Sequence, residues 1–378
     1  MPVTVFAVGD VFPAIEDGRA AFRELEPLLR SAGIVFGNCE GVYSDRPAKS
    51  PSRKHFMGAP RAYGAFLGEI PFHVMTLANN HMIDGGYVGL ADTKQLLREQ
   101  GIEVTGAGED IEQATTPAVL ERDGTTVAFL GFCSVYPVGY EARSDRPGLA
   151  PLRVRTHYED PDPNFWEPGI EPLISTAPFQ DDLRRFRAAI ASAREQADHV
   201  IVACHWGYSS WVEVVQDYEL QLARDAVEHG ADAVVCHHHH SLRGIELHEG
   251  KPIFHGLGAL VHHFVDFGST RESRAKLEQR YGERSAQRPD EFFELFPYRA
   301  DARRTGIATL ELAPGREIAA GFVPAMIMLD GSTEALRPDD PRAEDVAAYI
   351  ERLNTHAGFE TSLARGERDG YLELRVLQ

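Results

Sequence analysis

The sequence predicts an α/β protein in which short buried strands alternate with amphipathic helices. In the first third of the chain, apolar runs of strand length at 3–8 and 34–38 are separated by stretches with helical spacing. The same alternation returns later, with strands expected at 199–204 and 233–236. Such alternation is typical of βα units that build a sheet flanked by helices.

The other elements follow in chain order. Helices are expected over 20–32, 86–100, 179–196, 218–228 and 343–354. Further strands are expected at 72–77, 102–105, 126–132, 244–247 and 252–257, and a closing antiparallel meander at 305–312, 316–323 and 325–329. Residues 139–178 are rich in Pro, Asp and Arg, which predicts a long excursion with little regular structure. We expect one domain over 1–335 with a charged helical lid at 268–296, followed by a C-terminal helical extension over 336–378.

Composition narrows the class of protein. Of 378 residues, 38 are Lys or Arg and 57 are Asp or Glu, which gives a net charge of −19. This argues against a nucleic-acid binder, because phosphate contacts need a basic face. No run approaches the roughly 18 apolar residues of a membrane span, and the N-terminus lacks the features of a signal peptide. Four widely spaced cysteines indicate reduced thiols, so we expect a cytoplasmic protein; no pattern indicates an oligomeric state.

Polar side chains follow five of the expected strands at the point where each strand ends. These groups are Asp10, Glu40, the Asn79-Asn80-His81 run, His205 and the His237–His240 run. In α/β sheets, ligands gather beyond the carboxyl ends of strands. Each group alone also fits a cap, a turn or a buried hydrogen-bonded residue. Their coincidence at five strand ends predicts a metal site, and such oxygen and nitrogen donors suit Mn, Fe, Zn or Mg.

The motifs occur in a definite order along the chain. They are Gly9-Asp10, Asn38-x-Glu40-Gly41, Asn79-Asn80-His81-x-x-Asp84-x-Gly86, His205-Trp206-Gly207, the His-rich stretch from Cys236 to Gly244, and Lys251-Pro252-Ile253-Phe254-x-x-Leu257-Gly258. Over residues 3–262 the series resembles the CapA proteins, which are named for poly-γ-glutamate capsule synthesis and belong to the calcineurin-like metallophosphatase superfamily. The resemblance implies a metallophosphatase-like α/β/β/α sandwich of two mixed β-sheets flanked by helices, with a binuclear metal centre at the strand ends.

The resemblance also implies which residues hold divalent metal. Glu40 would be the carboxylate that bridges two ions. The remaining ligands would be Asn80, His205 and His238 for one ion, and Asp10 and His240 for the other. Imidazole and carboxylate donors together favour Mn, Fe or Zn, with one or two ions per chain.

Three positions depart from the family's pattern, and one of them is Ala259, which replaces an asparagine common after the Leu257-Gly258 step. Phe12 stands where metallophosphatases place a histidine, two residues after the first aspartate. The site that holds Asp10 should therefore bind metal weakly or not at all. His239 stands where a proline is expected, which leaves the choice of ligand among His237, His238 and His239 open.

Three further residues are expected to act in catalysis or substrate binding. By the same resemblance, His81 would be the general acid that protonates a leaving group, and Asp84 would orient its imidazole. Trp206 follows His205 and is expected to form part of an aromatic wall for substrate, although core packing explains its position equally well.

A basic patch follows Glu40 in this otherwise acidic chain. It consists of Arg46, Lys49, Arg53 and Lys54. The patch is either an ordinary solvated loop or a device that captures a carboxylate or phosphate of the substrate, for which arginine offers a bidentate fork. The second interpretation predicts an anionic small-molecule or peptide substrate.

Three functions are compatible with these residues. The ligand series favours a metal-dependent hydrolase acting on a phosphoester, or on an amide or peptide-type bond of an acidic amino-acid or peptide substrate. The alternative is a metal-independent epimerase in which Asp10 and a histidine exchange a proton at a Cα carbon, and Phe12 in place of a ligand is the feature that favours it. A noncatalytic partner in capsule biosynthesis is the third, because one fold hosts many functions.

Overall fold

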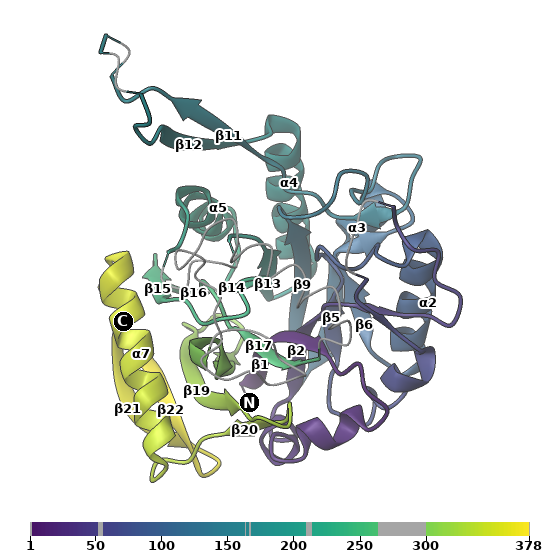
Figure 1. Ribbon diagram of the computed structural model, residues 1–378. Coiled ribbons are helices and arrows are strands. Elements are labelled where there is room, and N and C mark those ends of the chain that lie inside the picture. Colours follow the sequence, from purple (N-terminus) through teal and green to yellow (C-terminus); the bar gives the residue numbers. More distant parts are fainter. Residues whose placement is uncertain are drawn as a thin grey trace.

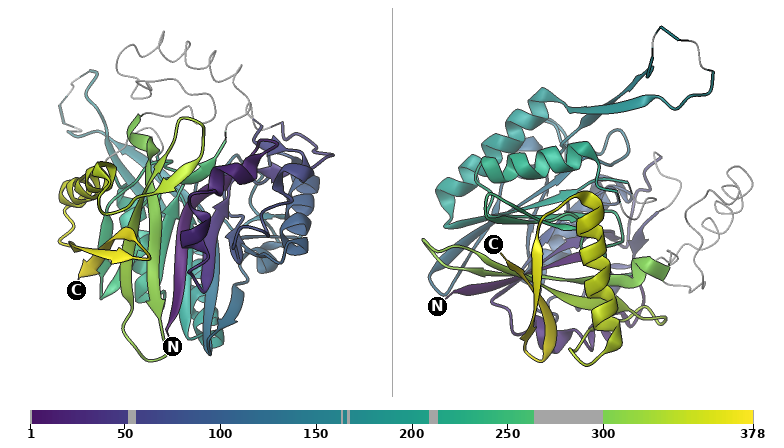
Figure 2. Two further views of the ribbon diagram at one scale, coloured as in Figure 1. Left: turned by 90° about the horizontal axis from the view of Figure 1, so that it is seen from below. Right: turned by 90° about the vertical axis from the view of Figure 1, so that its left-hand side faces the viewer.

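Two β-sheets pack face to face in this computed structural model, and helices cover both outer faces (Figures 1 and 2). The structure describes residues 2–51, 56–162, 164–165, 168–208, 214–263 and 300–377. The arrangement is the metallophosphatase-like α/β sandwich that the resemblance implied. The lid expected at 268–296 lies outside the described residues.

The larger sheet has ten strands in the order β21-β22-β19-β18-β1-β2-β5-β6, with β17 against β1 and β20 against β19. Their bounds are β1 Val3–Phe12, β2 Ile34–Cys39, β5 Val74–Thr76, β6 Glu103–Thr105, β17 Ala259–His262, β18 Arg304–Leu312, β19 Ala319–Ile327, β20 Thr333–Ala335, β21 Ser362–Arg368 and β22 Tyr371–Leu377. Strands β17, β1, β2, β5 and β6 are parallel, whereas β18 joins β1 antiparallel. The carboxyl ends of the five parallel strands therefore meet at one edge.

The smaller sheet has six strands in the order β15-β16-β14-β13-β9-β8. Their bounds are β8 Ala118–Arg122, β9 Thr125–Cys133, β13 His199–His205, β14 Ala233–His237, β15 Ile245–His248 and β16 Lys251–Phe254. The four central strands are parallel and the two edge strands are antiparallel.

Alternation along the central strands explains the layers. In β1, Val5 and Ala7 belong to the core between the two sheets, whereas Phe6 and Val8 belong to the core under the outer helices. Successive side chains of a strand point to opposite faces, and here both faces are covered. The central strands are therefore almost continuously apolar, which is why they were visible in the sequence.

The longer helices pack at different places on the two sheets. Their bounds are η1 Gly18–Phe22, α1 Glu26–Leu29, η2 Arg61–Gly64, α2 Gly86–Glu99, α3 Ile111–Ala114, α4 Gln180–Gln196, α5 Asp217–Glu228, η4 Ala300–Arg303 and α7 Pro341–Ala357. Helix α2 packs on the larger sheet, α4 and α5 pack on the smaller one, and α7 contributes to the core between the sheets. The single helix predicted at 20–32 is wrong. Pro27 lies in the first turn of α1 and has no N–H to continue a helix from residue 20.

Two other expectations about structure are corrected. The excursion at 139–178 contains β10 (Gly148–Leu149), which pairs with β7 (Ala107–Gly108), and a projecting hairpin of β11 (Val154–Glu159) and β12 (Leu173–Pro178) (Figure 1). The C-terminal extension is not only helical, because β21 and β22 join the larger sheet. Strands β11, β12 and β21 are largely exposed or half-buried and lack the apolar runs that mark buried strands. A last short pair, β3 (Val42–Tyr43) with β4 (Gly58–Ala59), flanks the segment that follows β2.

Candidate metal centre

Side chains from both sheets converge where the parallel strands end. Asp10 lies in β1, Glu40 directly follows β2, and His205 ends β13. His238 and His240 follow β14, and His262 ends β17. Asp10 and Glu40 are fully buried, so their charges need partners within the protein or a bound cation.

The position of β17 depends on a close approach to β1. A Cβ atom at Gly9 would lie 2.1 Å from the carbonyl oxygen of Gly258. The next residue, Asp10, donates its backbone N–H to that same oxygen at 3.1 Å. Only glycine at position 9 allows this contact. It sets a register in which Phe12 of β1 lies opposite His262 of β17.

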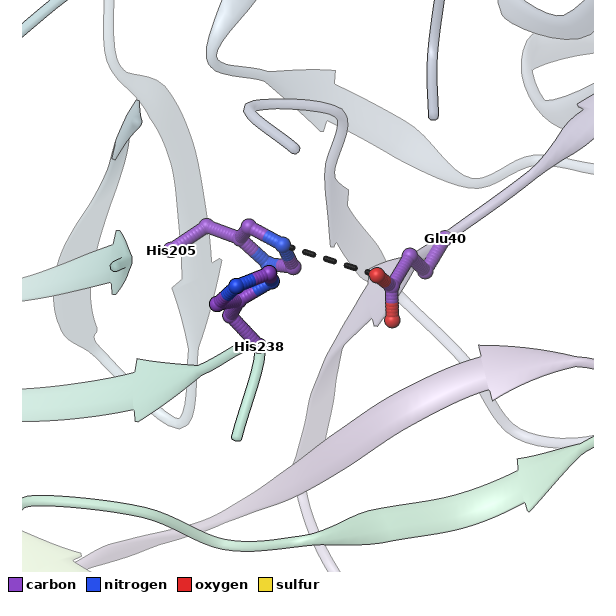
Figure 3. Close-up of side chains that lie close together, drawn as sticks. All are labelled: Glu40, His205 and His238. Atoms are coloured by element: carbon purple, nitrogen blue, oxygen red, sulfur yellow. Dashed lines mark ion pairs between the residues drawn. The ribbon is translucent and has the colours of Figure 1, made fainter. Parts of the chain in front are cut away.

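The first group of donors consists of Glu40, His205 and His238 (Figure 3). His205 Nε2 lies 3.5 Å from Glu40 Oε1. The same nitrogen lies 3.0 Å from Asn80 Oδ1. The rings of His205 and His238 are 4.9 Å apart between centroids. The structure thus brings together the four residues that the resemblance assigned to one ion.

The second group consists of Glu40, His240 and His262. His240 Nδ1 lies 3.0 Å from Asp10 Oδ2 and 3.7 Å from Glu40 Oε2. His262 Nε2 lies 3.5 Å from the same Glu40 oxygen. Glu40 therefore faces the first group with Oε1 and the second with Oε2, which is the arrangement of a bridging carboxylate.

These spacings can be compared with the needs of a metal ion. Nitrogen and oxygen ligands lie about 2.1 Å from a transition metal, so two ligands on one ion are roughly 3.0 to 3.5 Å apart at octahedral or tetrahedral angles. The separations given above, including those to Asn80 and Asp10, range from 3.0 to 3.7 Å, and all donor atoms within each group lie within 4.8 Å of one another. Both groups are therefore consistent with a divalent metal.

The electrostatics of the site also suit metal binding. Burial lowers the pKa of His205, His238 and His262, and neighbouring histidines lower it further, so these imidazoles are neutral at physiological pH. Burial alone would raise the pKa of Asp10, but the hydrogen bond to His240 brings that pKa well below its usual value. Neutral imidazoles and ionised carboxylates are the forms that bind metal.

The structure distinguishes the members of the histidine run. His237 Nε2 lies 3.1 Å from the carbonyl oxygen of Val8 and so ties the two sheets together. His239 Nε2 lies 2.8 Å from Glu219 Oε1, away from both donor groups. His238 is therefore the member of the three that joins the first group, and His240 joins the second.

His262 is the donor that the sequence interpretation missed. The expectation of a weak second site depended on Phe12, which replaces a histidine. In the structure His262 offers a ring nitrogen to the second group from the neighbouring strand. The second group therefore has a nitrogen donor in addition to His240, although Phe12 supplies none. The signal in the sequence was slight: a histidine ends the short apolar run that follows Leu257-Gly258.

The expected acid and its orienting carboxylate are also in contact. His81 Nδ1 lies 2.7 Å from Asp84 Oδ2. Asp84 accepts two further hydrogen bonds, from Tyr140 Oη at 3.0 Å and from the Met57 backbone N–H at 3.1 Å. Because Asp84 is held at three points, it fixes the ring orientation of His81 and favours the tautomer with hydrogen on Nδ1.

The residues expected to bind substrate do not form a common surface beside the donor groups among the residues that the structure describes. Trp206 is 1% exposed and packs in the core under α4 and α5, edge-on to Tyr218, so its assignment to a substrate wall is wrong. The guanidinium of Arg46 makes hydrogen bonds of 3.2 and 2.9 Å to the carboxylate of Asp92. The proposed capture residues Arg53 and Lys54 lie outside the described residues.

Fold and donor groups together define a protein of metallophosphatase-like architecture with a candidate site for divalent metal. The chain belongs to the family described as "Bacterial capsule synthesis protein PGA_cap", whose sequence model matches residues 4–263. This confirms the CapA resemblance. Within the described residues, no helix has both the length and the apolar character needed to cross a membrane.

Three relatives illustrate the similarity. "PGA biosynthesis protein CapA" of Bacillus subtilis (strain 168) is 30% identical over 260 residues, which cover 68% of this chain and 60% of that protein. "Capsule biosynthesis protein CapA" of Bacillus anthracis is 28% identical over 261 residues, which cover 68% and 56%. A probable polyglutamine synthesis accessory protein of Mycobacterium tuberculosis (strain ATCC 25618 / H37Rv) is 32% identical over 213 residues, which cover 55% and 50%. The matches thus span 50 to 60% of these relatives.

Proposed function

We propose that this chain is a metal-dependent hydrolase that cleaves an amide bond in an acidic peptide. The observation that carries the proposal is Glu40, whose two carboxylate oxygens face two separate groups of donors. A fully buried carboxylate among neutral imidazoles has a clear use if cations lie on either side of it. Mn, Fe or Zn fits the mixture of nitrogen and oxygen donors.

The contacts described above assign a role to each residue of the site. Glu40, Asn80, His205 and His238 would hold one ion, and Asp10, Glu40, His240 and His262 the other. When bound, such ions supply Lewis-acid activation of water and of the group under attack. His81 would carry a proton on Nε2 and deliver it to the leaving atom, while Asp84 keeps the ring in place through Nδ1.

The choice of substrate is supported by the relatives. The name of one relative refers to PGA biosynthesis, and poly-γ-glutamate, for which the CapA family is named, is an acidic chain joined by amide bonds. An anionic substrate must approach a chain of net charge −19, so the cations at Glu40 would supply the local attraction. A phosphoester is the second candidate, and the metallophosphatase-like fold is the observation that favours it.

The epimerase alternative loses its main support in the structure. It depended on a second site short of a nitrogen donor, and His262 provides that donor. The noncatalytic alternative keeps the support of the word "accessory" in the name of one relative. Activity measurements separate it from the hydrolase.

The test uses the full chain, first stripped with a chelator and then loaded separately with Mn²⁺, Fe²⁺ or Zn²⁺. Each form is incubated with a γ-glutamyl oligopeptide and with an aryl phosphate, and release of amino groups or of phosphate is measured. We expect metal-dependent release of amino groups, strongly reduced in His81→Asn. Release of phosphate alone would identify the second candidate. No turnover of either substrate by a fully loaded protein would contradict the hydrolase proposal.

A further inference from the structure

His239 lies between two proposed ligands in the sequence and yet belongs to neither donor group. Its ring nitrogen Nε2 lies 2.8 Å from Glu219 Oε1, at the start of α5. Both side chains are buried, with exposed fractions of 3% for His239 and 0% for Glu219. An interaction of this kind in the interior is strong, because little water competes for either partner.

Glu219 is itself held at the first turn of α5. Its second oxygen, Oε2, accepts the backbone N–H of Gln216 at 2.6 Å. Each carboxylate oxygen of Glu219 thus makes a hydrogen bond, Oε2 with the backbone N–H of Gln216 at the start of the helix and Oε1 with the ring of His239. The pair therefore links a rigid helix to the loop that follows β14.

The loop that follows β13 also packs against the Glu219–His239 pair, at Gly207. Gly207, two residues after His205, donates its backbone N–H to Tyr218 Oη at 2.7 Å. A Cβ atom at Gly207 would lie 2.0 Å from Glu219 Oε1 and 2.1 Å from His239 Nε2. Only glycine leaves room for the pair here. The loops that carry His205 and His238 therefore meet at Glu219.

The loop after β14 needs such support. His238 has φ 90° and His240 has φ 51°, both in the region that non-glycine residues rarely adopt. Residues in this region keep their conformation only where the surrounding structure holds them. His239 is the residue between them, and its contact with Glu219 is the attachment of that loop to α5.

We propose that the Glu219–His239 pair is a positioning device that holds His238 and His240 in place together, one for each donor group around Glu40. The proposal rests on the metal centre proposed above. It predicts that breaking the pair weakens both ion sites at once, whereas removal of a ligand that belongs to one group weakens that site alone.

The test is a titration of the metal-free protein with Mn²⁺. Calorimetry measures the affinity of each site, and elemental analysis measures the number of bound ions per chain. His239→Ala removes the contact with Glu219. We expect its affinity at both sites to fall about 10- to 100-fold, as for other residues that orient metal ligands. His239→Gln keeps an N–H donor for Glu219 and should bind Mn²⁺ within roughly threefold of the natural chain.

A matched control is available in the same molecule. His255 Nε2 lies 2.9 Å from Glu246 Oε2, and this pair is also buried. Among the described residues, the hydrogen bonds of these two side chains join them to each other and join Glu246 to Arg224, and none of them reaches the His237–His240 run or Gly207. Glu246→Gln alters this second buried Glu–His pair as Glu219→Gln alters the first, and because the second pair lies outside both donor groups, the Mn²⁺ affinity should be unchanged. If Glu246→Gln weakens Mn²⁺ as much as His239→Ala does, general destabilisation is the cause and the proposal is wrong.

Other outcomes are equally decisive. If His239→Ala binds two ions as tightly as the natural chain, or weakens only one, the pair does not position both ligands. If His239→Ala fails to fold, Glu219→Gln takes its place, because one of the two N–H donors then faces an amide NH₂ group. If the natural chain binds no Mn²⁺, Fe²⁺ or Zn²⁺, the proposed function fails and this inference fails with it. Unchanged binding in the variants sinks only the inference.

Discussion

Replacing His262 with alanine should remove one of two bound ions and leave the other in place. The second donor group would retain Asp10, Glu40 and His240, while the first group, which His262 does not join, would remain complete. Loss of a residue that only orients a ligand costs about 10- to 100-fold in metal affinity. Loss of a ligand itself should therefore cost at least about 100-fold at the second site.

The effect on stability follows from linkage. An ion present at 100 times its dissociation constant stabilises the folded protein by about 2.7 kcal/mol. If that constant rises 100-fold, the same ion concentration stabilises by only about 0.4 kcal/mol. The metal-dependent part of the free energy of unfolding should thus fall by about 2.3 kcal/mol in His262→Ala.

The assay is urea unfolding of both proteins with excess chelator and with Mn²⁺. The measurement with chelator isolates the cost of the cavity left by the buried ring, and the difference between the two conditions isolates the metal. A second variant adds Phe12→His, which returns a nitrogen donor from the opposing residue of β1 and should recover part of the difference. An unchanged difference in His262→Ala would refute the reasoning.

Three further predictions test other parts of the site and fold. His81→Asn should lower kcat about 10²- to 10⁴-fold with unchanged metal content, and loss of metal would instead make His81 a ligand. Burial alone would raise the pKa of Asp232, but hydrogen bonds from His199 and Lys251 lower it below its ordinary value. Asp232→Asn should therefore cost about 2 to 3 kcal/mol of unfolding free energy at pH 7, and the cost should begin to decline near pH 4 and be lost progressively as pH falls toward the lowered folded-state pKa. Trp206→Ala should lower the free energy of unfolding by about 3 to 5 kcal/mol and leave KM unchanged. A raised KM would instead support the interpretation from the sequence that Trp206 contacts the substrate.

Much of the site was visible in the sequence because of how parallel sheets are built. Asp10, Glu40 and His205 lie at or directly after the end of an apolar run in β1, β2 and β13, and the ends of neighbouring parallel strands share one edge. The prediction of a two-sheet sandwich rested on the resemblance to the CapA family, which the whole ordered series of motifs carries. Element positions were reliable where both faces of a strand are buried, since a continuous apolar run is then required.

The hidden parts depend on contacts between distant segments. The β11–β12 hairpin is solvated, so its residues carry no requirement for an apolar run. The roles of His237, His238 and His239 depend on backbone angles and on Val8 and Glu219, which lie far away in sequence. Because four histidines follow one another directly, the spacing of residue types along the sequence cannot distinguish one of them from the next.

Phe12 and His262 show why a missing motif residue did not mean a missing ligand. A metal ion requires donors at certain points in space, and two adjacent parallel strands can both reach the same point. Phe12 packs instead against Tyr43, with ring centroids 5.1 Å apart, and lies 6.1 Å from the ring of His262. A histidine at position 12 would place a polar ring where this apolar packing now lies. Moving the nitrogen donor to β17 thus keeps a donor for the second group and leaves the end of β1 apolar, a trade that only the pairing of β1 with β17 reveals.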